Sequence, residues 1–154
     1  MGDVRFHEAK IVDVEFGDNV TVVEPVNLYG CKIADDCFIG PFVEIQRDTS
    51  IGARTRVQSH SFLCEMVTIG EDCFVGHGVM TINDRFQHGR PSSERDDWGE
   101  TRIGDRVSIG SNVTLLPVNI CDDVVVGAGA VVTKDIDKPG IYAGNPARFI
   151  RTLP

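Results

Sequence analysis

The fold is decided by the stretch Ile69-Gly70-Glu71-Asp72-Cys73-Phe74-Val75-Gly76-His77-Gly78-Val79-Met80. It contains two copies of a six-residue unit: an aliphatic residue, then glycine, with a small or β-branched residue at the fifth position. The unit returns at Ile103 and again at Ile109. Helices have a period of 3.6 residues and single strands a period of 2, so a sustained period of six fits neither. The pattern predicts short strands joined by tight turns, with one large and one small side chain per unit pointing inward.

The unit extends in both directions along the chain, and its first position is aliphatic or aromatic throughout. These first-position residues are Phe16, Val22, Leu28, Ile33, Ile39, Ile45, Ile51, Val57, Leu63, Ile69, Val75, Ile103, Ile109, Leu115, Ile120, Val126 and Val132. Three units make one coil of a triangular prism, so we expect coils to begin near residues 16, 33, 51, 69, 103 and 120. Only the polar stretch from Asn83 to about Thr101 interrupts the pattern.

This ladder resembles that of the hexapeptide-repeat acyltransferases, which fold as a left-handed parallel β-helix. The resemblance covers roughly residues 16–136 and implies one all-β domain. We expect an N-terminal cap over residues 1–15, the β-helix over 16–136 with a loop at about 84–101, and a C-terminal extension over 137–154 that leaves the ladder. The family also implies a homotrimer with active sites between neighbouring subunits.

Composition excludes several other classes of protein. The 154 residues suit a single domain, and a net charge of −8 without a basic run argues against nucleic acid as a partner. No apolar run is long enough to cross a bilayer, and the N-terminus has no apolar signal segment, so we expect a cytoplasmic protein without a membrane partner. None of the five cysteines forms a Cys-x-x-Cys pair, which disfavours zinc-ribbon and thioredoxin sites.

Two segments near the C-terminus resemble the branch of this family that uses acyl-coenzyme A. They are Val126–Asp135, which is rich in glycine and alanine, and Gly144-Asn145-Pro146-Ala147-Arg148. The resemblance implies that acetyl-CoA is the co-substrate. In the positions of this chain, it implies a cofactor site made of Gly110, Ser111, Gly127, Ala128, Lys134, Pro146 and Arg148.

The interruption after Asn83 contains the only tryptophan, Trp98, together with Phe86. A disordered linker seldom contains such residues. Long loops in compact domains are usually functional or disordered. We therefore expect an ordered excursion that packs against a neighbouring subunit or covers a ligand.

Coil spacing predicts a polar cluster beside this loop. His60 and His77 are seventeen residues apart, and Glu65 and Asn83 are eighteen apart, so each pair should stack on adjacent coils. The stretches that hold them resemble N-acetyltransferases acting on nucleotide-linked sugars, notably those that modify a 3-amino group. That match also includes Asp84.

The resemblance implies acetyl-CoA-dependent N-acetylation of a nucleotide-linked amino sugar for surface polysaccharide. A neutral imidazole suits the role of base, so His77 is the first candidate, while Asn83 would align the amine. A substrate-assisted route, in which the leaving sulfur receives the proton, stays open. The predicted substrate-binding residues are His60, Glu65, Asp84 and Arg85, and no metal is expected.

Three alternatives differ in the chemistry they need. O-acetylation of a sugar hydroxyl demands a stronger base than N-acetylation. A zinc carbonic anhydrase on the same prism needs three histidines around the metal, whereas only His60 and His77 occupy neighbouring coil positions here. A non-catalytic scaffold would not need the Asn83-Asp84 pair or the C-terminal Asn-Pro-Ala-Arg segment.

Overall fold

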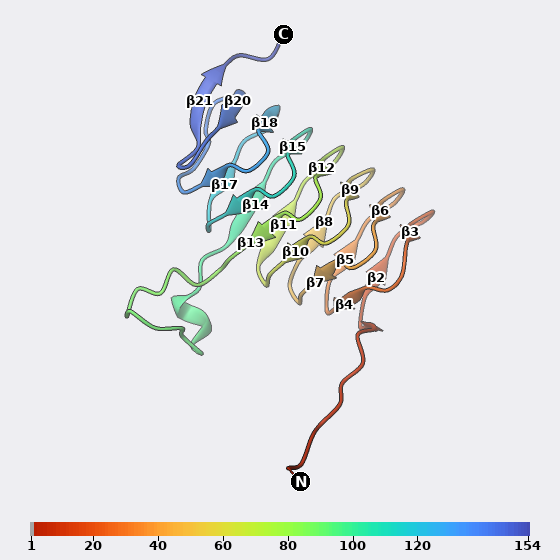
Figure 1. Ribbon diagram of the computed structural model, residues 1–154. Helices are drawn as coiled ribbons and strands as arrows, with labels where there is room; N and C mark the ends of the chain where they lie inside the picture. Colours follow the sequence, from red (N-terminus) through yellow and green to blue (C-terminus); the bar gives the residue numbers. More distant parts are fainter. Residues whose placement is uncertain (1) are drawn as a thin grey trace.

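The computed structural model describes residues 2–154 as a stack of triangular coils along one axis (Figure 1). Three sheets form the faces of the prism, and we call them A, B and C. Sheet A contains β1 (Ile11–Val12), β4 (Asn27–Tyr29), β7 (Glu44–Ile45), β10 (Phe62–Leu63), β13 (Met80–Thr81), β16 (Thr114–Leu115) and β19 (Val131–Val132). Sheet B contains β2 (Glu15–Phe16), β5 (Lys32–Ile33), β8 (Ser50–Ile51), β11 (Val67–Ile69), β14 (Thr101–Ile103) and β17 (Asn119–Ile120). Sheet C contains β3 (Thr21–Val22), β6 (Phe38–Ile39), β9 (Arg56–Val57), β12 (Phe74–Val75), β15 (Ser108–Ile109), β18 (Val124–Val126), β20 (Gly140–Ala143) and β21 (Arg148–Arg151).

The register of sheet B confirms the predicted coils. Phe16 pairs with Ile33, and the series continues in parallel through Ile51, Ile69, Ile103 and Ile120. The long interruption therefore leaves the stack in register, because Ile69 and Ile103 are partners across it. The predicted left-handed parallel β-helix is confirmed.

Side chains of the first position fill the centre of the prism. Ile39, Ile45 and Leu115 are fully buried, whereas Phe16 in the terminal coil is 43% exposed because no further coil covers it. Full burial of each such side chain contributes about 1.5–3 kcal/mol.

Thr81 also occupies a first position, although the aliphatic column omits it, and it is fully buried. Its hydroxyl accepts the backbone N–H of Cys64 at 2.8 Å and donates to the carbonyl of Phe62 at 3.3 Å. A hydrogen-bonded hydroxyl is tolerated in the core. The prediction missed this residue because only apolar residues were assigned to the column.

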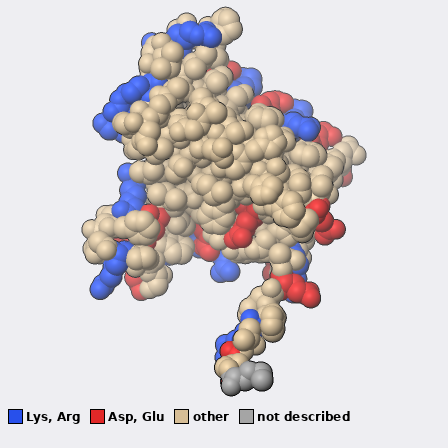
Figure 2. Space-filling view, in the orientation of Figure 1, with Lys and Arg blue, Asp and Glu red and all other residues tan. Residues whose placement is uncertain are grey.

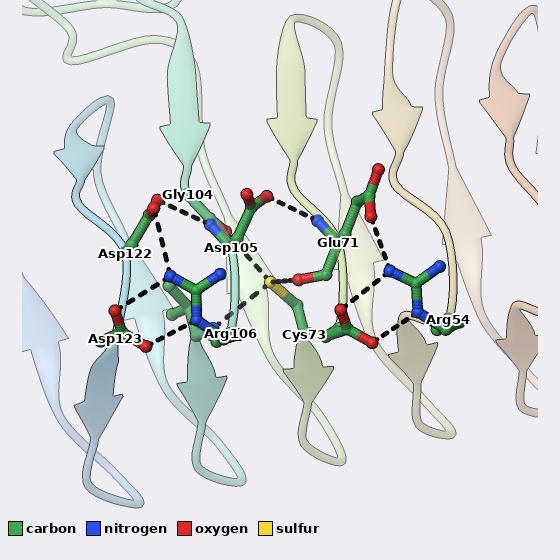
Figure 3. Close-up of polar contacts among 10 residues, drawn as sticks. Arg54, Glu71, Cys73, Gly104, Asp105, Arg106, Asp122 and Asp123 are labelled. Atoms are coloured by element: carbon green, nitrogen blue, oxygen red, sulfur yellow. Dashed lines mark hydrogen bonds and ion pairs between the residues drawn. The ribbon is translucent and has the colours of Figure 1, made fainter.

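The edge between sheets B and C is held by ion pairs between successive coils (Figure 3). Arg106 Nε donates to Asp123 Oδ1 at 2.7 Å, and Arg54 Nε donates to Asp72 Oδ1 at 2.7 Å. These hydrogen bonds to the guanidinium groups hold the pKa values of Asp72 and Asp123 below the ordinary aspartate range. The arginine and aspartate side chains at this edge thus form hydrogen bonds that join successive coils.

The two ends of the chain differ from the predicted boundaries. Strand pairing begins at Ile11, inside the predicted cap, and residues 2–10 extend away from the prism rather than over its end (Figure 1). Val4 and Phe6 are accordingly 70% and 90% exposed. Met1, the first residue of the predicted cap, lies outside the described residues.

The C-terminal stretch was expected to leave the ladder, but β20 continues sheet C in parallel with β18. The chain then returns antiparallel as β21, and the rings of Tyr142 and Phe149 meet edge to face at 5.5 Å. Across residues 2–154, no helix has the length and apolar character needed to cross a membrane.

Candidate functional site

The edge between sheets C and A holds a column of residues that we call the turn column: Ser59, His77, Ser111 and Ala128. Backbone hydrogen bonds fix it, since Gly78 N–H donates to Ser59 O at 3.0 Å and Asn112 N–H to His77 O at 2.8 Å. Gly129 N–H likewise donates to Ser111 O at 2.9 Å. His77 therefore lies between Ser59 and Ser111 on adjacent coils, with an exposed side chain.

Four predicted cofactor residues are brought together at this edge. Gly110 and Ser111 lie one coil from His77, and Gly127 and Ala128 lie one coil further. A Cβ on Gly110 would lie 2.5 Å from the backbone nitrogen of Ala128, so successive coils approach too closely here for a side chain. Gly110 is thus required for the close packing of successive coils. It also leaves the polar backbone beside His77 uncovered by a side chain.

The predicted Asn-Pro-Ala-Arg segment lies at the end of the turn column. Val131 N–H donates to Gly144 O at 3.0 Å, and Ala147 N–H donates to Val131 O at 2.8 Å. These bonds place Pro146 next to the coil that contains Ala128. Arg148 begins β21, and its side chain is exposed.

Lys134, by contrast, is separated from the turn column. It follows β19, whereas Ala128 precedes that strand, so the two residues lie at opposite edges of sheet A. The structure thus brings six of the seven predicted cofactor residues to one region and leaves Lys134 apart.

The four predicted polar residues near the loop form two pairs rather than one cluster. His77 precedes β13 and Asn83 follows it, so they lie at opposite edges of sheet A. Full extension of six residues would span about 20 Å, and the turn at Gly78 makes the separation somewhat shorter. His60 accompanies His77, and Glu65 accompanies Asn83. The coil spacing placed Glu65 beside Asn83 and put His60 one residue out of register with His77. Its combination of the two pairs was wrong because six residues cross one whole face of the prism.

His60 stacks differently from the expectation. Its register partner is Gly78, one residue beyond His77, because His60 N–H donates to Pro41 O and Gly78 N–H to Ser59 O. The imidazole of His60 packs on the ring of Phe42, with centroids 4.8 Å apart.

Glu65 belongs to an ion-pair network. Its carboxylate lies 3.5 Å from Arg47 Nε and 3.3 Å from Arg95 Nη1, and its side chain is only 16% exposed. Arg95 also bonds Asp48 at 2.6 Å, which ties the loop to the prism. The charge of Glu65 is thus compensated within the chain.

The loop after Asn83 is closed at its base. Asn83 O accepts the N–H of Gly99 at 2.8 Å, and Asp84 pairs with Trp98 in an antiparallel bridge. The carboxylate of Asp84 accepts the N–H groups of Phe86 and Ser92, each at 2.7 Å. The loop is therefore an ordered excursion, as expected, and it contains a short 3-10 helix, η1 (Arg95–Asp97).

Two predicted substrate-binding residues have structural contacts in this loop. Asp84 accepts the two backbone N–H groups just described, and Arg85 donates to the carbonyl of Pro117. Between the loop and sheet A lies a hollow of about 300 Å³, lined in part by Phe62, Asn83 and Trp98. Asn83 thus borders a small cavity with aromatic walls.

The cysteines show no sign of nucleophilic function. All five are free thiols, and four of them are buried. Burial raises the pKa of Cys31 to about 11 and raises the pKa of the other four as well. In residues 2–154, no group of three or more His, Cys, Asp or Glu side chains is arranged to hold a metal ion.

Two sequence families match the chain. Residues 30–65 match the family described as bacterial transferase hexapeptide (six repeats), and residues 100–134 match hexapeptide repeat of succinyl-transferase. The bifunctional protein GlmU of Nostoc is 32% identical over 97% of this chain and 31% of the relative, so the chain spans less than a third of that protein's length.

Solved structures share the fold. AntD, an N-acyltransferase from Bacillus cereus in complex with dTDP and coenzyme A, superposes with a TM-score of 0.71 at 20% identity, covering 94% of this chain and 86% of AntD. Perosamine N-acetyltransferase from Caulobacter crescentus, in complex with coenzyme A and GDP-perosamine, has a TM-score of 0.62 at 18% identity, covering 92% and 57%. The chain is a β-helical hexapeptide-repeat protein, and its repeats match those of bacterial transferases over residues 30–65 and 100–134.

Proposed function

We propose that this protein transfers an acetyl group from acetyl-CoA to the amino group of a nucleotide-linked amino sugar. The observation that carries the proposal is the turn column, in which His77 shares one edge of the prism with Ser111 and Ala128. A long thioester donor that follows the flat backbone of Gly110 and Gly127 would bring its reacting end to His77. The Gly144–Arg148 segment at the end of the column would then meet the distal, phosphate-bearing part of the donor.

The chemistry needs one proton acceptor. The neutral amine attacks the thioester carbonyl, the C–N bond forms, and collapse of the intermediate breaks the C–S bond. His77 is exposed at the column and accepts the proton lost by the amine, which the leaving thiolate finally receives.

The protein acts as a homotrimer in this proposal. His77 and Asn83 lie at opposite edges of one face, so Asn83 reaches His77 only from another subunit. Phe42, Phe74 and Met80 are 57%, 40% and 41% exposed, which supplies apolar area near these edges. Figure 2 shows a broad area without charged side chains, with acidic and basic residues around its rim. Cyclic association of such faces closes the assembly.

The acceptor is inferred from the structural neighbours. AntD is in complex with dTDP, and the Caulobacter enzyme is in complex with GDP-perosamine. A 3-amino sugar destined for surface polysaccharide is the specific acceptor that we propose. The five free thiols are consistent with a cytoplasmic setting, where disulfides are rare.

Thiol release from acetyl-CoA, measured with a panel of nucleotide-linked 3-amino, 4-amino and hydroxyl sugars, tests the proposal. We expect turnover with 3-amino sugars. Turnover with hydroxyl sugars alone would favour O-acetylation, and a lack of acetyl-CoA binding by calorimetry would favour a scaffold.

A further inference from the structure

Asn112 is a polar residue beside the turn column, and within residues 2–154 no contact with its neighbours in the fold explains its side chain. Asn112 follows Ser111, and it belongs to a row of residues with positive φ, one per coil, that runs parallel to the turn column. The row consists of Phe42, His60, Gly78, Asn112 and Gly129, with φ between 58° and 71°. In this row Asn112 lies between Gly78 and Gly129, on the coil next to that of His77.

The amide of Asn112 leans toward the coil of His77. A Cβ on Gly78 would lie 2.5 Å from Asn112 Oδ1, so this amide occupies the space that a side chain at position 78 would fill. A Cβ on Gly129 would meet nothing within 4 Å. Gly78 makes room for the amide because it has no side chain. Gly129 leaves the other side of the amide uncovered.

Asparagine is common at positive φ, so the backbone alone offers an explanation for this residue. Some other corner residues with positive φ, however, use their side chains to join coils. Asn19 Nδ2 donates to Asp36 Oδ1 at 3.3 Å, and Arg106 bonds Asp123 at 2.7 Å. Within the described residues, the side-chain amide of Asn112 makes no hydrogen bond. With its carbonyl end at Gly78, its NH₂ end is a free donor.

We propose that the Asn112 amide donates a hydrogen bond to the thioester carbonyl oxygen of the acyl donor, an inference that rests on the proposed function. Neighbouring coils lie about 4.8 Å apart, so a carbonyl placed between them is within reach of both His77 and Asn112. When the amine attacks, the carbonyl π electrons move to oxygen, and the amide stabilises that negative charge. Collapse restores the C=O bond and breaks the C–S bond. Acyl transfer requires a base and a hydrogen-bond donor to the oxyanion, placed around the thioester carbonyl carbon. His77 and Asn112 would supply these two groups.

Replacing Asn112 with glycine separates the two explanations, because glycine keeps the positive φ and removes the amide. Loss of one oxyanion donor typically lowers turnover by about 100- to 1000-fold. We expect Asn112→Gly to lose turnover on that scale, with little change in the dissociation constant of coenzyme A by calorimetry. The matched control is Asn19→Gly, the same change at the same backbone conformation on the opposite edge, and it should retain wild-type turnover.

A second variant guards against a folding defect. Asn112→Asp keeps size and backbone preference, but an ionised carboxylate donates no hydrogen bond. Turnover should fall at least as far as in Asn112→Gly. A purely structural asparagine would not produce this loss, because aspartate also tolerates positive φ.

The outcomes distinguish this inference from the proposed function. If the wild-type protein releases no thiol from acetyl-CoA with any acceptor of the panel, the proposed function fails. If the wild type is active and Asn112→Gly or Asn112→Asp retains turnover within about threefold, only the role of Asn112 is overturned. If Asn19→Gly loses as much turnover as Asn112→Gly, the effect belongs to the fold, and the assignment is again overturned.

Discussion

His77 and Asn83 lie at the two ends of the same strand, β13, so one subunit presents them at different edges of its prism. One whole face of the prism separates them, up to about 20 Å for six residues, which is longer than any contact between side chains. A site that uses both residues therefore requires two subunits, and this relationship leads to the first prediction.

Mixing two impaired variants should restore activity. We expect His77→Asn and Asn83→Ala each to have reduced turnover alone and to regain turnover after they are unfolded and refolded together. In randomly mixed trimers about a quarter of the interfaces would contain both native residues. Thiol release measures the recovery, and sedimentation of each variant alone is the control for assembly. A monomer at micromolar concentration, or no recovery from mixed trimers, would show that the site is not shared.

The two residues should also differ in the kind of defect that their loss causes. His77→Asn keeps polarity but accepts no proton near neutrality, so turnover should fall about a hundredfold or more. Asn83→Ala removes alignment of the amine and should cost roughly tenfold to a thousandfold. Retention of most activity by His77→Asn at pH 7, with loss in Asn83→Ala, would mean that the proton leaves by the substrate-assisted route.

The cofactor site predicts a change in binding without a change in chemistry. Arg148→Ala should raise the KM for acetyl-CoA with little effect on turnover, because a phosphate contact far from the reacting carbon stabilises ground state and transition state equally. Arg151→Ala removes an arginine from the same strand and serves as the matched control. A large fall in turnover at saturating acetyl-CoA would contradict the placement of Arg148.

The base of the loop should depend on Asp84. Its carboxylate accepts two backbone N–H groups, so Asp84→Ala leaves both unpaired and should loosen residues 84–98. We expect protease cleavage within the loop to accelerate about tenfold, and the emission of Trp98 to shift toward that of a solvated indole. Asp96→Ala, a change at an exposed position of the same loop, provides the comparison. Equal cleavage of the two variants would argue against this anchoring role.

Acid should weaken the edge between sheets B and C. The guanidinium groups of Arg54 and Arg106 lower the pKa of Asp72 and of Asp123 in the folded state, so each carboxylate favours folding when ionised. That contribution is present above the unfolded pKa of about 3.9 and is lost as the pH falls through the lower folded pKa. Thermal unfolding between pH 6 and pH 3 should show Tm falling in the acid range, and Arg106→Gln should reduce that fall. A pH dependence identical to that of the wild type would remove this explanation.

The sequence by itself determined the architecture, because the β-helix repeats the same local geometry in every coil. Each unit places one large and one small side chain inward, so the period of six fixes the coils, and Ile69 finds Ile103 across the loop. The same regularity placed His77 one coil from Ser111, even though 34 residues separate them in the chain.

Only the tertiary structure decided which side chains meet at the edges and which are committed to the fold. The sequence predicts that Asp84 and Glu65 bind substrate, and only the structure shows that the first accepts backbone N–H groups and the second pairs with two arginines. Asn112 carried no signal in the sequence, because asparagine at a turn is ordinary. Its importance comes from the space over Gly78 and from the lack of a partner among residues 2–154. Such contacts depend on three-dimensional neighbours outside the repeat, so a six-residue period contains no information about them.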